Sequence, residues 1–153
     1  PPLDNEKAIK NPAVVSKSDT DFIKSMVIFK DDNIIVLNKP SGLAVQGGTN
    51  TDRHIDGMLD ALKFENSEKP KLVHRIDKDT SGILVLARNR RYAELLTKAF
   101  REHMLQKTYL VLAIGALKNP EGEIKISLEK VGEKMEPSEE GKKAVTRFKV
   151  LDS

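Results

Sequence analysis

The chain has 153 residues and a mass of 17.1 kDa, and its 39% hydrophobic and 32% charged residues suit one globular domain with a real core. It contains no cysteine, no signal-peptide pattern and no apolar run long enough to span a membrane, so we expect a cytoplasmic protein without a disulfide framework. The net charge is only +3, but residues 71–107 carry nine Lys or Arg against four Asp or Glu. Such a basic segment indicates a polyanionic partner or a solvated helix face.

Residues 1–25 lack hydrophobic periodicity and are interpreted as a linker or arm in which no core begins. Two strands are predicted at residues 26–30 and 34–39. The turn-forming Asp31-Asp32-Asn33 between them favours a hairpin, and Pro40 ends the second strand.

Two helices are predicted from apolar residues at helical spacing. The first contains Ile55, Met58, Leu59 and Leu62 on one face, with Thr51 or Asp52 as its cap. The second runs from residue 90 to 104 and is capped by Asn89.

Four further strands are predicted, at residues 83–87, 107–114, 123–128 and 144–151. The first is a short uninterrupted apolar run, which is typical of a strand buried on both faces. The Glu-, Lys- and Gly-rich residues 129–143 should be mobile. Strands outnumber helices and several are hairpin-like, so the predicted fold class is α+β, with a mixed, largely antiparallel sheet and packed helices.

The densest polar cluster precedes the buried strand. His74-Arg75-Ile76-Asp77 is followed by Thr80-Ser81-Gly82 at the mouth of the strand, and loops mounted on buried strands are where catalytic residues concentrate. Either Asp77 or Asp79 could serve as a catalytic carboxylate on chemistry alone. The alternative for each is a turn-forming aspartate that bonds backbone amides.

This block resembles the signature motif of the RluA-type pseudouridine synthases, which isomerise selected uridines in RNA. Residues 32–42, Asp-Asn-Ile-Ile-Val-Leu-Asn-Lys-Pro-Ser-Gly, are similar to the earlier strand-and-turn motif of that family. Residues 106–113, Gln-Lys-Thr-Tyr-Leu-Val-Leu-Ala, are similar to its later tyrosine motif. The resemblance covers residues 26–153 and implies the pseudouridine synthase catalytic-domain fold.

The resemblance implies that Asp77 is the catalytic carboxylate, acting as nucleophile or as base; the residues leave both roles open. It also implies four substrate-binding residues. Arg75 would fill the gap left by a flipped uridine, and Tyr109 would lie against the target base. His74 would orient the loop through hydrogen bonds, and Lys39 would shape the pocket floor.

Two of these residues have alternative interpretations that do not depend on the resemblance. Arg75 could instead form an ion pair with Asp77 or Asp79. Tyr109 stands in a segment rich in Val and Leu, where a lone aromatic side chain is more often part of a core.

In the resembled family, the catalytic domain continues into a motif rich in Gly, Arg, Thr, His and Gln, and nothing here matches that motif. We therefore expect residues 26–153 to be a partial catalytic domain that is inactive alone. Residues 1–25 would follow a missing N-terminal RNA-binding domain.

The expected function is an isomerase that converts uridines to pseudouridines in RNA, with 23S-type large-subunit ribosomal RNA as the partner. No cofactor, metal or membrane is expected, and the full-length protein should be a monomer. The alternatives are a non-catalytic RNA-binding or ribosome-assembly module on the same fold, or a tRNA-modifying member of the family.

Overall fold

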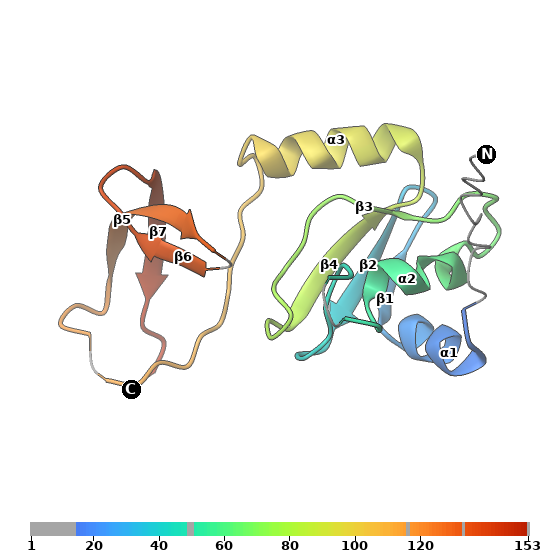
Figure 1. The fold of residues 1–153 in the computed structure, drawn as a ribbon, viewed down its shortest axis with the longest axis horizontal. Helices are drawn as coiled ribbons and strands as arrows, with labels where there is room; N and C mark the ends of the chain where they lie inside the picture. Colours follow the sequence, from blue (N-terminus) through green and yellow to red (C-terminus); the bar gives the residue numbers. More distant parts are fainter. Residues whose placement is uncertain (1–14, 49–50, 116, 133, 153) are drawn as a thin grey trace, which may run out of the picture. The chain divides into compact units, whose positions relative to one another are not determined.

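A computed structural model describes residues 15–48, 51–115, 117–132 and 134–152. The chain divides into two compact units, Pro1–Lys107 and Thr108–Ser153. Each unit carries its own antiparallel sheet (Figure 1). No described helix is long and apolar enough to cross a membrane.

The first unit is built on a four-stranded sheet in the order β1-β2-β4-β3, in which all neighbouring strands are antiparallel. Its strands are β1 (Val27–Lys30), β2 (Ile34–Lys39), β3 (Lys71–Leu72) and β4 (Gly82–Ala87). The predicted hairpin is confirmed as β1 and β2. The Asp31 carboxylate closes its turn by accepting the N–H groups of Asn33 and Ile34, both at 2.7 Å, and these bonds lower the pKa of Asp31.

One face of this sheet forms the core. Ile35 and Leu37 of β2 pair with Leu86 and Leu84 of β4, and all four side chains are fully buried. Helix α1 (Lys17–Ser25), helix α2 (Ile55–Met58) and the 3₁₀ helix η1 (Leu59–Leu62) supply the rest of the core together with Met26, Leu43 and Val45 (Figure 1).

The expectation that no core begins within residues 1–25 is wrong. Ser16 caps α1 by accepting the N–H of Asp19, and Ile23 is fully buried among the sheet residues. Residues 1–14 lie outside the described part of the chain.

The four apolar residues predicted for the first helix are all buried, as expected, but they are shared between α2 and η1. The predicted caps, Thr51 and Asp52, are wrong. His54 is the cap, because its Nδ1 accepts the N–H of Gly57 at 3.1 Å.

Strand β4 is buried on both faces only at its end, which corrects the prediction for residues 83–87. Leu84 and Leu86 are fully buried in the core, whereas on the opposite face Ile83 is 55% exposed, Val85 is half-buried and Ala87 is buried. Helix α3 (Arg90–Arg101) follows β4 and is capped by Asn89 as predicted, although it ends three residues early. All of α3 is described, and none of its side chains is buried.

The second unit is a three-stranded antiparallel sheet in the order β6-β5-β7 (Figure 1), formed by β5 (Glu121–Val131), β6 (Lys134–Pro137) and β7 (Lys142–Lys149). The strands predicted at residues 123–128 and 144–151 are confirmed with shifted ends. The predicted mobility of residues 129–143 is wrong, because β6 pairs with β5 there. The predicted α+β fold with largely antiparallel sheets is confirmed.

The strand predicted at residues 107–114 is also wrong. This segment is irregular and fully exposed at Leu112 and Ile114. Its backbone has no neighbouring strand among the described residues, and an apolar sequence cannot form a strand without one.

Candidate active site

In the loop that precedes β4, two side chains are exposed to solvent and two others pack into the protein. Val73 is buried and Ile76 packs against the core, whereas Arg75 and Asp77 are exposed. Arg75 and Asp77 are two positions apart and flank Ile76, the spacing at which side chains of an extended segment point to the same side. The predicted gap-filling arginine and the predicted catalytic carboxylate are thus both open to solvent.

The loop enters β4 through a turn that requires glycine. The N–H of Thr80 donates to the carbonyl oxygen of Asp77 at 3.2 Å, and Gly82 follows with a φ of +112°. Residues with a Cβ atom rarely adopt such an angle. Gly82 therefore permits the entry of the loop into the strand through its backbone conformation.

Lys39 supports this loop through a hydrogen bond to its backbone. Its side chain is fully buried at the end of β2, and its Nζ donates to the carbonyl oxygens of Pro40 at 2.9 Å, Leu43 at 2.8 Å and Lys78 at 2.9 Å. An ammonium group has three donors, and all three are used inside the protein. Lys39 therefore supports the loop and has no free donor to offer a ligand.

The environment of Lys39 contains two opposing influences on its pKa. Burial lowers the pKa of Lys39, while the nearby carboxylates of Asp79 and Asp77 act to raise it. Two neighbouring bonds strengthen the same tie: the Ser41 hydroxyl donates to the carbonyl oxygen of Asp79 at 2.7 Å, and the N–H of Gly42 donates to that of Lys78 at 2.9 Å. The turn after β2 and the loop before β4 are thus held as one piece.

His74 ties the loop to two other elements. Its Nε2 accepts the N–H of Val85 in β4 at 2.9 Å, and its ring stacks on Phe100 of α3 with centroids 4.1 Å apart. Burial, and secondarily the charge of Lys107, lowers the pKa of His74. Because Nε2 accepts a hydrogen bond, the ring is neutral with its proton on Nδ1. The geometry agrees with the predicted orienting role.

The carboxylate of Asp77 is exposed and available to a substrate. Among the described residues, no side chain forms a hydrogen bond or ion pair with its carboxylate, and the alternative in which Arg75 pairs with Asp77 or Asp79 is not observed. The carboxylate of Asp79 forms no such contact with the described residues either, and only its backbone carbonyl is bonded, by Ser41. Within the described part of the chain, the loop therefore offers two unengaged carboxylates, Asp77 and Asp79, and one unengaged guanidinium, Arg75.

Tyr109 belongs to the second unit, where its side chain is 55% exposed in an irregular segment. The alternative of core packing is therefore not observed. Its predicted contact with the target base stays a prediction.

Sequence reasoning placed Arg88 within the basic segment, but this side chain is not part of the exposed basic surface. Its guanidinium is buried, forms an ion pair with Glu65 at 2.9 Å and donates to the carbonyl oxygen of Asp31. The bond with Arg88, aided by Lys30, lowers the pKa of Glu65 to about 2. Arg88 thus fastens the β1–β2 turn to the loop that contains Glu65.

No group of three or more His, Cys, Asp or Glu side chains in the described part of the chain is arranged to hold a metal ion. The residues that sequence reasoning missed are Ser41 and Phe100, which act by supporting the loop. Ser41 was part of the quoted Asn-Lys-Pro-Ser-Gly motif, so its position was visible, but its partner across the fold was not.

Comparison with known proteins identifies relatives of similar sequence. The chain is 38% identical to RNA pseudouridine synthase 4, mitochondrial, of Arabidopsis thaliana, over 90% of this chain and 34% of that protein. It is 41% identical to ribosomal large subunit pseudouridine synthase C of Rickettsia bellii, over 83% of this chain and 44% of that protein. The chain thus spans less than half the length of these curated relatives.

Solved structures share the fold. Human RNA Pseudouridylate Synthase Domain Containing 4 superposes with a TM-score of 0.74 at 27% identity, covering 89% of this chain and 58% of that one. The family model described as RNA pseudouridylate synthase matches residues 33–153, which include the Lys39 turn, the Asp77 loop and Tyr109. This chain therefore belongs to the RNA pseudouridylate synthase family.

Proposed function

We propose that the protein containing this chain isomerises uridines to pseudouridines in RNA, with Asp77 as the catalytic carboxylate. The observation that carries the proposal is the exposed, unpartnered carboxylate of Asp77 on a loop that Lys39 and His74 fix by hydrogen bonds, and its place in the signature motif distinguishes it from the likewise exposed Asp79. A catalytic group needs a side chain that can reach the substrate and a backbone that is held in place.

The proposed reaction breaks the bond between N1 of uracil and C1′ of ribose, turns the released base and joins C5 to C1′. The proton on C5 is lost and N1 gains one, so no atom or electron is supplied from outside. A carboxylate suits this reaction because it can attack the sugar as a nucleophile, or act on it as a base, while stabilising positive charge on the ring.

Large-subunit ribosomal RNA is the proposed substrate. The support is that relatives from Rickettsia, Vibrio vulnificus and Haemophilus influenzae carry the name ribosomal large subunit pseudouridine synthase C. Arg75 would occupy the stack vacated by the flipped uridine, and Tyr109 would stack on the base, a contact worth about 1–3 kcal/mol.

The test compares Asp77→Asn with Asp79→Asn in the complete gene product, using tritium release from RNA that contains 5-³H-uridine. We expect Asp77→Asn to lose at least the roughly 10²–10⁴-fold that acid–base catalysis contributes, while RNA binding survives. Asp79→Asn is the matched control and should be mild. Equal activity in both variants would refute the assignment of Asp77. An RNA-binding wild type that releases no tritium from large-subunit RNA, transfer RNA or other cellular RNA would favour a non-catalytic module.

A further inference from the structure

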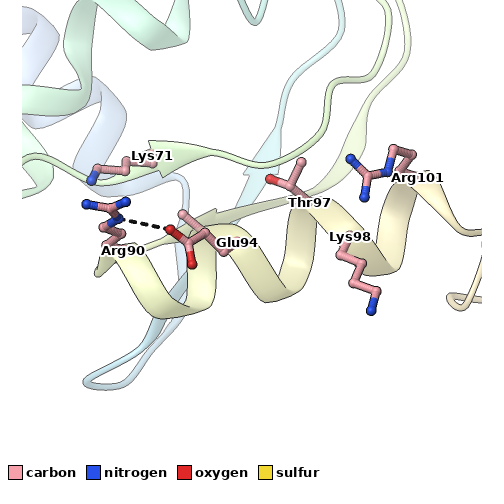
Figure 2. Close-up of a pocket in the computed structure, with 7 residues that line it drawn as sticks. Lys71, Arg90, Glu94, Thr97, Lys98 and Arg101 are labelled. Carbon is pink, nitrogen blue, oxygen red and sulfur yellow. Dashed lines mark hydrogen bonds and ion pairs between the residues drawn. The ribbon is translucent and has the colours of Figure 1, made fainter.

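A shallow groove of about 640 Å³ runs along α3 beside β3 (Figure 2), and its lining includes no residue of the Asp77 loop. Its lining includes one face of the helix together with one strand residue: Lys71, Arg90, Glu94, Thr97, Lys98 and Arg101. Four of these six side chains are cationic and one is anionic. We propose that this groove binds the phosphate backbone of the substrate RNA beside the target uridine, an inference that rests on the proposed function.

The cations of the groove remain available to a ligand. Arg90 and Glu94 form an ion pair at 2.9 Å, but their side chains are 86% and 68% exposed. Lys71 bonds Glu68 at 3.3 Å in a similarly exposed pair. Exposed pairs of this kind contribute little, so phosphate oxygens can replace their carboxylates.

The shape of the groove suits a phosphate backbone better than bases. Arg90 and Arg101 lie eleven residues apart on α3. At 1.5 Å per residue their backbone positions are separated by roughly 16 Å, which is long enough to follow several consecutive phosphates of one strand. None of the described lining residues is aromatic, so the groove provides no platform for base stacking. Binding here should therefore be independent of RNA sequence.

Helix α3 also contacts the Asp77 loop. The ring of Phe100 stacks on His74, which precedes Asp77 by three residues and accepts the N–H of Val85 in β4. An RNA segment held along α3 is thus fixed relative to the catalytic carboxylate by direct side-chain contacts. Binding in the groove would assist the reaction, because an RNA segment held next to the target uridine orients that uridine when it is flipped.

Two arginines on α3 provide a matched test. Arg101 lines the groove and its side chain is 72% exposed, whereas Arg91 is exposed on the same helix but outside the lining. We expect Arg101→Gln to weaken binding of a fluorescent RNA stem-loop by roughly two- to fivefold at moderate salt. It should also reduce the slope of log affinity against log salt by about 0.7–0.9, the value of one lost phosphate contact. Arg91→Gln should leave both quantities near those of the wild type.

Glu94→Gln supplies a change of opposite sign. Removing the only carboxylate of the lining frees Arg90, so RNA should bind more tightly, an outcome that misfolding cannot produce. The effects should be equal for a large-subunit ribosomal stem-loop and for an unrelated one. If Arg101→Gln and Arg91→Gln weakened RNA binding equally, or if Glu94→Gln did not increase RNA affinity, the proposal that this groove binds RNA would be refuted.

The two proposals fail in different measurements. If RNA binding responds to these substitutions as expected but no tritium is released from any RNA, the groove proposal is supported and the catalytic proposal fails. If Asp77→Asn abolishes tritium release while Arg101→Gln and Glu94→Gln bind RNA like the wild type, the catalytic proposal stands and the groove fails.

Discussion

The buried Nζ of Lys39 donates a hydrogen bond of 2.9 Å to the backbone carbonyl of Lys78, the residue that follows Asp77. The two lysines are 39 positions apart in the chain. The last residue of β2 therefore fixes the Asp77 loop without a hydrogen bond to the Asp77 carboxylate. Ser41 adds a second bond to the same loop at Asp79.

Replacing Lys39 by methionine should destabilise the fold and loosen the loop. The change removes a donor from three carbonyl oxygens, and among the described residues only that of Lys78 keeps another, the N–H of Gly42. We therefore expect a loss of about 2–4 kcal/mol in the free energy of unfolding. Urea denaturation measures the loss, and hydrogen exchange at the N–H of Gly42 and Thr80 reports the loop. Lys78→Met is the control, because it keeps the backbone carbonyl and alters only an exposed side chain. If both variants had equal stability, Lys39 would not support the loop as described.

Gly82→Ala should cost about 1–3 kcal/mol through backbone strain alone. The φ of Gly82 is +112°, and an added Cβ atom would meet nothing within 4 Å, so no clash contributes. Gly48 is a matched control, since a Cβ there also meets open space and its φ is ordinary. Thermal or urea denaturation of Gly48→Ala should show no loss, and a small gain would fit the reduced entropy of its unfolded chain. A Gly82→Ala variant as stable as the wild type would show that the strand entry adapts.

Stability should fall in mild acid because of His74. Burial lowers the pKa of His74 in the folded state, so the unfolded chain binds the proton more readily. The contribution is therefore complete above the unfolded pKa of about 6.5 and decreases as the pH falls below it towards the folded pKa. Protonation of Nε2 also removes the acceptor for the N–H of Val85.

The check is urea denaturation between about pH 5 and pH 7.5 in the wild type and in His74→Gln. The glutamine keeps an acceptor but does not titrate, so its stability should depend less on pH in this window. His103→Gln is the control, because His103 is exposed and forms none of these contacts. An unchanged pH dependence in His74→Gln would contradict the neutral, accepting ring.

Local patterns predicted the elements whose signals lie within one segment. The β1–β2 hairpin followed from two apolar runs around Asp31, and α3 followed from its Asn89 cap and its apolar stripe. Helix α1 was missed although Ser16 and Asp19 form a capping pair, because its apolar residues are too sparse to show a period. Strand β6 was missed because its charged residues are held by pairing with β5 rather than by burial.

The site was predictable to the extent that one motif contains it. Asp77, Arg75 and Gly82 lie within nine residues, and their exposure and backbone geometry agree with the predicted loop at a strand mouth. The contacts from Lys39 and Phe100 could not be predicted, because they depend on which strand ends and helix faces meet in three dimensions. The burial of Arg88 could not be predicted for the same reason, because its partner Glu65 is 23 positions away in the chain.

Arg75 provides the sharpest test of how the uridine is reached. Its exposed guanidinium has no ion-pair partner among the described residues, so it is free to enter the stack that a flipped base leaves. Flipping costs a few kcal/mol when the uridine is paired or stacked and little when it is already unstacked. The need for Arg75 should therefore depend on the structure of the RNA around the target.

We expect Arg75→Ala to lower kcat/KM by roughly 10- to 100-fold on a stem-loop whose target uridine is stacked, because each tenfold loss corresponds to about 1.4 kcal/mol of the flipping cost. On RNA of the same length with the target in an unpaired, unstacked segment, the loss should be about threefold or less. Arg75→Lys should fall between, because an ammonium keeps the charge but lacks the plane that stacks on bases. Tritium release by the complete gene product measures all three. An equal loss on both RNAs would place Arg75 in the chemical step or in general binding, and the gap-filling role would then be wrong.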